Sequence, residues 1–164
     1  MRRALRWTVW GLVVAVALVW GVGAMLPEAH VGVAQAEFSR PPAEIFATVS
    51  DVSAYPAWWP EVSQVEMLPA EAGRVRFRMH LEGPVVMEVV ESAPPARFVT
   101  RIADPGQPFG GTWTYEIEPA GTGSRLTITE RGEIYSAPFR FFARFVFGYT
   151  ATIESCLAAL ARRG

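Results

Sequence analysis

Lysine is absent from the 164-residue sequence, and all fifteen basic residues are arginine. Without a lysine amine the chain cannot form a Schiff base with a carbonyl substrate, and it lacks the lysine of a P-loop nucleotide site. A single cysteine, Cys156, excludes an intramolecular disulfide. Two histidines, His30 and His80, are too few for the familiar zinc-ligand spacings. The sequence therefore predicts neither a metal site nor a cofactor.

Charged residues of either sign are also scarce. They make up 19% of the chain, and the formal net charge is −1. Because no basic field is present to attract a phosphate backbone, we expect no nucleic-acid partner. Aromatic residues, in contrast, reach 12% of the chain. The informative features of this sequence are therefore its apolar segments.

The first apolar segment is a run without charge over residues 7–26. This length matches the ~20 residues that cross a ~30 Å hydrocarbon layer. Three arginines precede the run, and Glu28 and His30 follow it, so the positive-inside rule places the N-terminus in the cytoplasm. We expect a single-pass membrane protein in which residues 1–27 form the cytoplasmic tip and transmembrane helix. Residues 28–164 form an extracytoplasmic domain.

A cleaved signal peptide is the alternative interpretation, because Ala34-Gln35-Ala36 resembles a cleavage site. The apolar run is longer than a usual signal h-region, and this site lies well beyond its end. Cleavage would also remove most of the segment that we expect to form the first strand. We favour a retained anchor, with secretion after cleavage as the alternative.

Alternating apolar and polar residues predict a series of strands after two short helices. The clearest alternation places Val75, Phe77 and Met79 on one face and three arginines on the other. Short helices are predicted at residues 42–50 and within the Pro-rich, aromatic segment 55–60. The expected strands are residues 30–40, a strand beginning near residue 62, and residues 74–82, 85–91, 97–103, 111–118 and 125–134.

The last apolar segment, residues 137–163, predicts one long helix. Large apolar side chains recur there at three- and four-residue spacing, Pro138 suits a first turn, and two arginines suit a last turn. The dry face of an antiparallel meander must cover such a helix. Additional phenylalanines lie off the main stripe, so we expect the first half of the helix to face a ligand, a lid or a membrane surface.

Four motifs give the chain a resemblance to a known superfamily. They are PAEIFATVSD at 42–51, YPAWWP at 55–60, GTWTY at 111–115 and GSRLTITERG at 123–132. Over about residues 28–163 the chain resembles the START/polyketide cyclase-like (SRPBCC) superfamily. The resemblance implies an α+β helix-grip fold, in which a curved antiparallel sheet of six to seven strands wraps around a long C-terminal helix. Two short helices follow strand 1, and here one transmembrane helix precedes the domain.

Members of this superfamily include polyketide aromatases and cyclases, lipid- and ubiquinone-binding proteins and hormone receptors. They share a cavity between sheet and helix rather than a catalytic signature. The residues that we expect to line such a cavity here are Trp58, Phe77, Met79, Met87, Thr100, Trp113, Tyr115, Glu130, Phe142, Phe145 and Tyr149. The alternative is a core that these large side chains fill completely.

Glu130 is the most informative polar residue, because it shares the parity of Leu126 and Ile128. If it points inward, it is a candidate hydrogen-bonding group or base with a raised pKa. Alternatively, a bulge near Gly132 turns it outward to pair with an arginine. Thr100 is a second inward candidate, whereas His80 and the arginine row are expected on the solvated face.

The function that we favour is a membrane-anchored domain that binds a hydrophobic small molecule or lipid between its sheet and its last helix. One alternative is a polyketide cyclase/aromatase-like enzyme in which Glu130 and Tyr115 or Tyr149 move protons. The sequence reveals no His–carboxylate pair and no catalytic triad, so no catalytic residue is assigned and a non-enzymatic role is favoured. The other alternative is a structural or protein-interaction module with a filled core.

Overall fold

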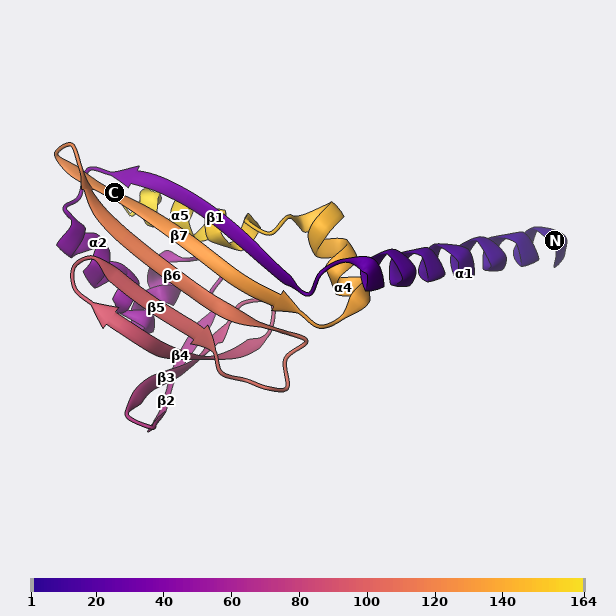
Figure 1. Ribbon diagram of the computed structural model, residues 1–164, viewed down its shortest axis with the longest axis horizontal. Helices are drawn as coiled ribbons and strands as arrows, with labels where there is room; N and C mark the ends of the chain where they lie inside the picture. Colours follow the sequence, from indigo (N-terminus) through magenta and orange to yellow (C-terminus); the bar gives the residue numbers. More distant parts are fainter. Residues whose placement is uncertain (1, 164) are drawn as a thin grey trace.

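The computed structural model describes residues 2–163, and side chains from residue 7 onward. Seven antiparallel strands form one sheet in the order β1-β7-β6-β5-β4-β3-β2 (Figure 1). The strands are β1 (Ala29–Phe38), β2 (Gln64–Glu71), β3 (Arg74–His80), β4 (Pro84–Ala93), β5 (Arg97–Ile102), β6 (Phe109–Ala120) and β7 (Gly123–Ile134). The helices are α1 (Arg2–Met25), α2 (Pro42–Ser50), the 3₁₀ turn η1 (Val52–Ala54), α3 (Tyr55–Trp58), α4 (Ala137–Phe142), the π-helical turn η2 (Ala143–Phe147) and α5 (Ala151–Arg162).

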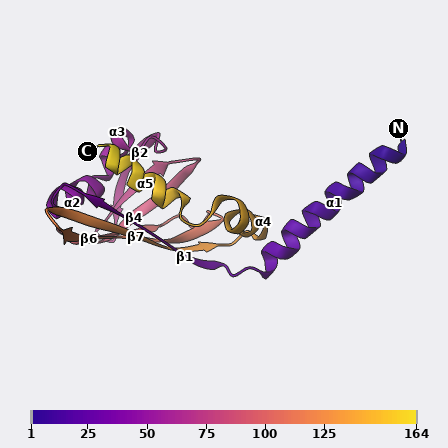
Figure 2. The same cartoon turned by 90° about the horizontal axis from the view of Figure 1, so that it is seen from above.

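The sheet is a meander that the first strand completes. Consecutive strands from β2 to β7 pair as neighbours, and β1 pairs antiparallel with β7 from Ala29 to Phe38. Helices α2, α3 and α5 lie on one face of the sheet (Figure 2). The side chains between the layers include Ile45, Leu126 and Ile153, each with no exposed surface. The predicted α+β helix-grip fold, with two short helices after strand 1, is confirmed.

The opposite face of the sheet carries the arginine row in ion pairs. Arg74 donates a hydrogen bond to Glu88 over 3.1 Å, and Arg78 donates one to Glu66 over 2.7 Å. Arg101 also binds Glu88, which is buried between the two guanidinium groups. This face is charged and paired, as the alternation of the strand residues predicted.

The C-terminal segment differs from the single long helix that we predicted. It breaks at Gly148, which has φ 80° and ψ 160°, a conformation that is essentially restricted to glycine. The break separates α4 and η2 from α5, and only α5 packs over the core. Phe142 and Phe145 are consequently 39% and 59% exposed, so their expected place under the sheet is wrong.

Helix α1 projects away from the sheet, and its last turn lies beside α4 (Figures 1 and 2). Its residues Trp7–Met25 are long and apolar enough to cross a membrane. A signal sequence near the N-terminus can also meet these criteria of length and hydropathy. The division into an anchor and a separate domain therefore stays a prediction.

Candidate functional site

Three of the predicted site residues lie side by side in one row across the inner face of the sheet. In the strand register Trp113 of β6 is opposite Glu130 of β7 on one side and Thr100 of β5 on the other. Gly32 of β1 completes the row beside Glu130. Glu130 thus lies on the inner face, and the register between β6 and β7 continues without a bulge. Strands distant in sequence therefore place a carboxyl, an indole and a hydroxyl next to one another.

His30 joins Glu130 to form a His–carboxylate pair that the sequence did not reveal. Its Nε2 atom lies 3.7 Å from Oε1 of Glu130, and its ring stacks on Tyr149 with 4.3 Å between ring centres. The sequence signal was the parity of β1, in which His30 shares a face with the small residues Gly32 and Ala34. Our expectation that no such pair exists is wrong, because β1 and β7 meet only in the folded sheet.

Two glycines make room for this arrangement. A Cβ atom at Gly132 would lie 2.3 Å from Cε1 of His30, so a side chain there would displace the imidazole. A Cβ atom at Gly32 would lie 2.7 Å from the carbonyl oxygen of Tyr149, which shows how closely the α4–α5 connection approaches the sheet. Glycine at both positions lets the histidine ring and the connection lie directly over the strands.

The environment changes the proton affinity of both members of the pair. Burial raises the pKa of Glu130 to about 7, and a hydrogen bond with Trp113 acts in the opposite direction. Burial lowers the pKa of His30 below its ordinary value of 6.5. Its Nδ1 atom is buried and has no hydrogen-bond partner among residues 2–163. Near neutral pH the carboxyl can therefore gain or lose a proton beside a neutral imidazole.

The inner face of the sheet is incompletely buried at this row. On β7, Leu126 and Ile128 are completely buried, whereas the side chain of Glu130 is 22% exposed. On β6, Tyr115 is buried and Trp113 is half-buried. Because the break at Gly148 ends the cover that α5 provides, Glu130 and Trp113 are partly open to solvent, whereas Gly132 and Ile134 further along β7 are buried again.

The other predicted site residues fall into two groups. Buried members of the hydrophobic core are Trp58, Phe77, Met79, Met87 and Tyr115, and Thr100 is a buried polar residue. Burial raises the pKa of Tyr115 well above its ordinary value, and a hydrogen bond links it to Tyr55. Phe142 and Phe145 lie outside the core on α4 and η2. The structure therefore aligns Thr100, Trp113 and Glu130 in one row across three strands, and it places His30, stacked on Tyr149, beside Glu130 at the end of that row.

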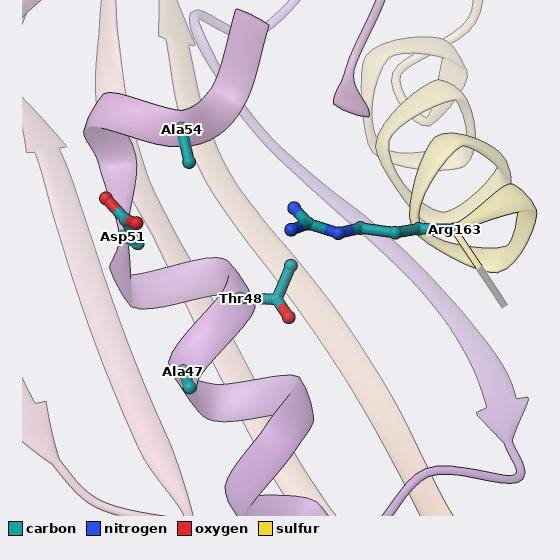
Figure 3. Close-up of a pocket in the computed structure, with 5 residues that line it drawn as sticks. All are labelled: Ala47, Thr48, Asp51, Ala54 and Arg163. Carbon is teal, nitrogen blue, oxygen red and sulfur yellow. The ribbon is translucent and has the colours of Figure 1, made fainter. Parts of the chain in front are cut away.

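A separate surface pocket of about 200 Å³ lies on the helical side of the molecule. Figure 3 shows Arg163, at the end of α5, extending toward the residues of α2 and η1 that line this pocket. Its lining residues are Ala47, Thr48, Asp51, Ala54 and Arg163. None of the predicted site residues belongs to it.

Comparison with protein families gives one match, which covers residues 30–164. The matching family is described as polyketide cyclase / dehydrase and lipid transport. The match begins at the histidine of the pair described above and includes the whole sheet except Ala29. No curated protein matches the chain.

Solved structures with the same fold have low sequence identity to this chain. A START superfamily protein from Mycobacterium smegmatis is 22% identical, with a TM-score of 0.66 over 82% of this chain and 96% of that one. The Zhui aromatase/cyclase from Streptomyces sp. R1128 is 12% identical, with a TM-score of 0.65 over 82% and 93%. Norcoclaurine synthase from Thalictrum flavum is 10% identical, with a TM-score of 0.64 over 82% and 86%. At these identities the similarity establishes the fold alone.

Proposed function

Because the chain belongs to the polyketide cyclase/dehydrase and lipid transport family, we propose that it binds a hydrophobic small molecule or lipid against the inner face of its sheet. The observation that carries this proposal is the incomplete burial of the inner face at the Glu130 row. There an apolar surface with half-buried Trp113 adjoins two polar groups, Glu130 and His30. A mostly apolar surface with a few convergent polar groups is typical of small-molecule sites.

We also propose that α1 is retained as a membrane anchor. The structure supports retention because cleavage after Ala36 would remove most of β1, which pairs with β7 along its length. It would also remove His30 from the site. A tether keeps the domain beside the bilayer, in which apolar ligands concentrate, and so raises the effective ligand concentration.

Native mass spectrometry of the detergent-extracted full chain tests ligand binding. We expect a mass shift from a co-purifying apolar ligand. We also expect saturable binding of the fluorescent probe N-phenyl-1-naphthylamine. Replacing Trp113 with Ala should weaken probe binding, because it removes an aromatic surface from the row. Thr114→Ala is the matched control, since Thr114 is the next residue on β6 and points to the other face. If the wild-type chain shows no added mass and no saturable probe binding, the result would favour the filled-core interaction module.

The His30–Glu130 pair favours an enzymatic role as the second candidate function. With a pKa of about 7, Glu130 can remove a proton from the carbon beside a ligand carbonyl and later return it. The neutral imidazole of His30 can donate a hydrogen bond to the enolate oxygen that forms. Tyr115, which is buried and bound to Tyr55, is poorly suited to the proton-transfer role that the sequence suggested for it.

Exchange of the methyl protons of 2-acetylnaphthalene with D₂O, followed by NMR, tests this second candidate. We expect the full chain to accelerate exchange and Glu130→Gln to abolish the acceleration while probe binding persists. Glu133 lies on the exposed face of the same strand, so the Glu133→Gln variant should catalyse exchange of the methyl protons at the wild-type rate. Equal exchange by wild type and Glu130→Gln would remove Glu130 as the base.

A further inference from the structure

Five large apolar side chains are exposed within nine residues of the α4–η2 segment. The side chains, which we call the α4–η2 patch, are Phe139, Phe142, Phe145, Val146 and Phe147. Each is between 39% and 61% exposed. Three ring contacts lie within the segment itself: Phe141 contacts Phe145 at 5.0 Å and Phe142 at 5.6 Å, and Phe142 contacts Phe147 at 6.3 Å. An apolar cluster of this density is unusual on a surface that faces only water.

Arg140 fixes the position of this segment at the end of α1. Its Nε donates a hydrogen bond to the carbonyl oxygen of Gly23 over 2.9 Å, and Nη1 donates one to Glu28 over 2.9 Å. Nη1 also donates to the carbonyl oxygen of Ile134 over 3.3 Å, and Arg140 is buried. The Gly23 carbonyl is one of the last four in α1; it accepts a backbone hydrogen bond from Leu26 over 3.3 Å and the shorter one from Arg140. Arg140 therefore caps α1 and holds α4 to it.

The backbones of the two helices also approach closely. A Cβ atom at Gly23 would lie 1.9 Å from the carbonyl oxygen of Ala137, so only glycine permits this contact. Figures 1 and 2 both show α4 between the last turn of α1 and the rest of the domain. These contacts thus fix the position of the α4–η2 patch along the axis of α1, at the level of its last turn.

The length of α1 sets that level relative to a bilayer. At about 1.5 Å per residue, the 19 residues Trp7–Met25 extend for about 28 Å, close to the ~30 Å of the hydrocarbon layer. A spanning α1 has no spare turn, so its last turn must lie at the hydrocarbon boundary. The segment capped to that turn lies at the same boundary.

The charge of the segment also suits a lipid surface. Residues 137–149 contain Arg140 and Arg144 and no acidic residue, whereas residues 27–164 as a whole carry more acids than arginines. Arg144 is exposed, with its guanidinium 6.0 Å from the ring centre of Phe145. An arginine beside exposed phenylalanines is typical of segments that lie in a membrane interface, where the cation reaches the head groups.

We propose that the α4–η2 patch inserts into the interface of the bilayer that α1 spans. This inference rests on the proposed anchor, and it adds a second membrane contact made by the domain itself. The same segment continues through Gly148 to Tyr149, which stacks on His30. Docking therefore brings the partly exposed Glu130 row close to lipid. An apolar ligand then passes between the membrane and the sheet without crossing water.

Site-specific fluorescence in liposomes tests the proposal on the full chain. Three separate variants, Phe145→Cys, Val14→Cys and Val75→Cys, carry an environment-sensitive thiol label and are reconstituted with lipids brominated on their acyl chains. The native Cys156 is buried with a raised thiol pKa, so it stays unlabelled. Val14 reports the middle of α1. Val75 is 47% exposed on β3, a strand that lies away from α1 (Figure 1), and it is the control for an exposed apolar position.

We expect blue-shifted, bromine-quenched emission at positions 14 and 145 and unquenched emission at 75. Quenching at 14 without quenching at 145 overturns the docking proposal and leaves the anchor intact. Absence of quenching at both positions overturns the anchor together with the inference that rests on it. Circular dichroism of each labelled protein verifies its fold. Quenching at 75 equal to that at 145 would also overturn the proposal, because the contact would not be specific to the patch.

Discussion

Burial of Glu130 disfavours its charged form. The unfolding free energy of the protein should therefore depend on pH in a direction that can be measured. The folded chain keeps the Glu130 proton up to about pH 7, whereas the unfolded chain loses it near the ordinary value of 4.5. Folding therefore binds a proton between these values, and the stability contributed by the protonated carboxyl is lost as pH rises through 7.

Glu130→Gln removes this pH-dependent penalty. We expect the variant to be more stable than wild type at pH 8, by up to about 3 kcal/mol from the linkage of pKa to stability. The difference should disappear toward pH 4.5. The lowered pKa of His30 penalises folding only below its ordinary value of 6.5, and this contribution is common to both proteins. Urea unfolding at several pH values measures the difference.

The control for this prediction is Glu133→Gln, which lies on the exposed face of the same strand. It should show no comparable gain at pH 8. A Glu130→Gln difference that is the same at pH 5 and pH 8 would show that packing, not charge, causes the effect.

At this scale parity indicated the inner face for Glu130 and Thr100, but the sequence left open a bulge near Gly132 that would turn Glu130 outward; the uninterrupted register of β6 and β7 removes that alternative. Parity did not identify His30 as the partner of Glu130, because the two residues are one hundred positions apart and meet only where β1 pairs with β7. The role of Gly132 was equally hidden, since the need for glycine arises from the histidine on the neighbouring strand.

The C-terminal elements show why apolar spacing can predict a helix and miss its break. The three- and four-residue pattern continues across residues 142–153, and a glycine within such a pattern is often tolerated in a helix. The break depends on tertiary contacts, because Arg140 attaches α4 to α1 while α5 packs on the core. Gly148 is the residue whose backbone can turn between these two directions.

Gly148→Ala tests this account. A Cβ atom at φ 80° and ψ 160° is strained even though nothing lies within 4 Å of it, so we expect a loss of about 1–3 kcal/mol in unfolding free energy. Gly83→Ala is the control, because that glycine also has open space and lacks a positive φ. Chemical denaturation measures the unfolding free energy of both variants, with the two full-length proteins in one detergent. If Gly148→Ala is as stable as Gly83→Ala, the connection between η2 and α5 does not require glycine.

On the scale of the whole molecule, the order of strands and helices was predictable because each has a local signature. Alternation identified the strands, breakers such as Gly83-Pro84 marked their ends, and Pro42 began the first short helix. Whether α1 is retained or cleaved was not settled by the sequence, because a membrane span and a signal sequence can meet the same criteria of length and hydropathy. What favours retention is long-range: β1 follows α1 directly and is an integral strand of the sheet.

Two truncated chains test the dependence of the domain on β1. A chain beginning at residue 28 keeps all of β1, whereas one beginning at residue 37 keeps only its last two residues. The shorter chain leaves β7 as an unpaired edge and uncovers core side chains that Ala34 and Ala36 contact. We expect cooperative thermal unfolding by circular dichroism for the chain from 28 and none for the chain from 37, both in mild detergent.

Equal cooperativity in the two truncated chains would remove the structural argument against cleavage after Ala36. The same argument applies to the native protein, whose N-terminus can be determined by intact mass after alkaline extraction of membranes. Because a chain without β1 lacks both a strand and His30, we expect the native N-terminus to lie before residue 29. A native chain that resists extraction and contains residues 7–25 would join the sheet to the bilayer through the Arg140 cap.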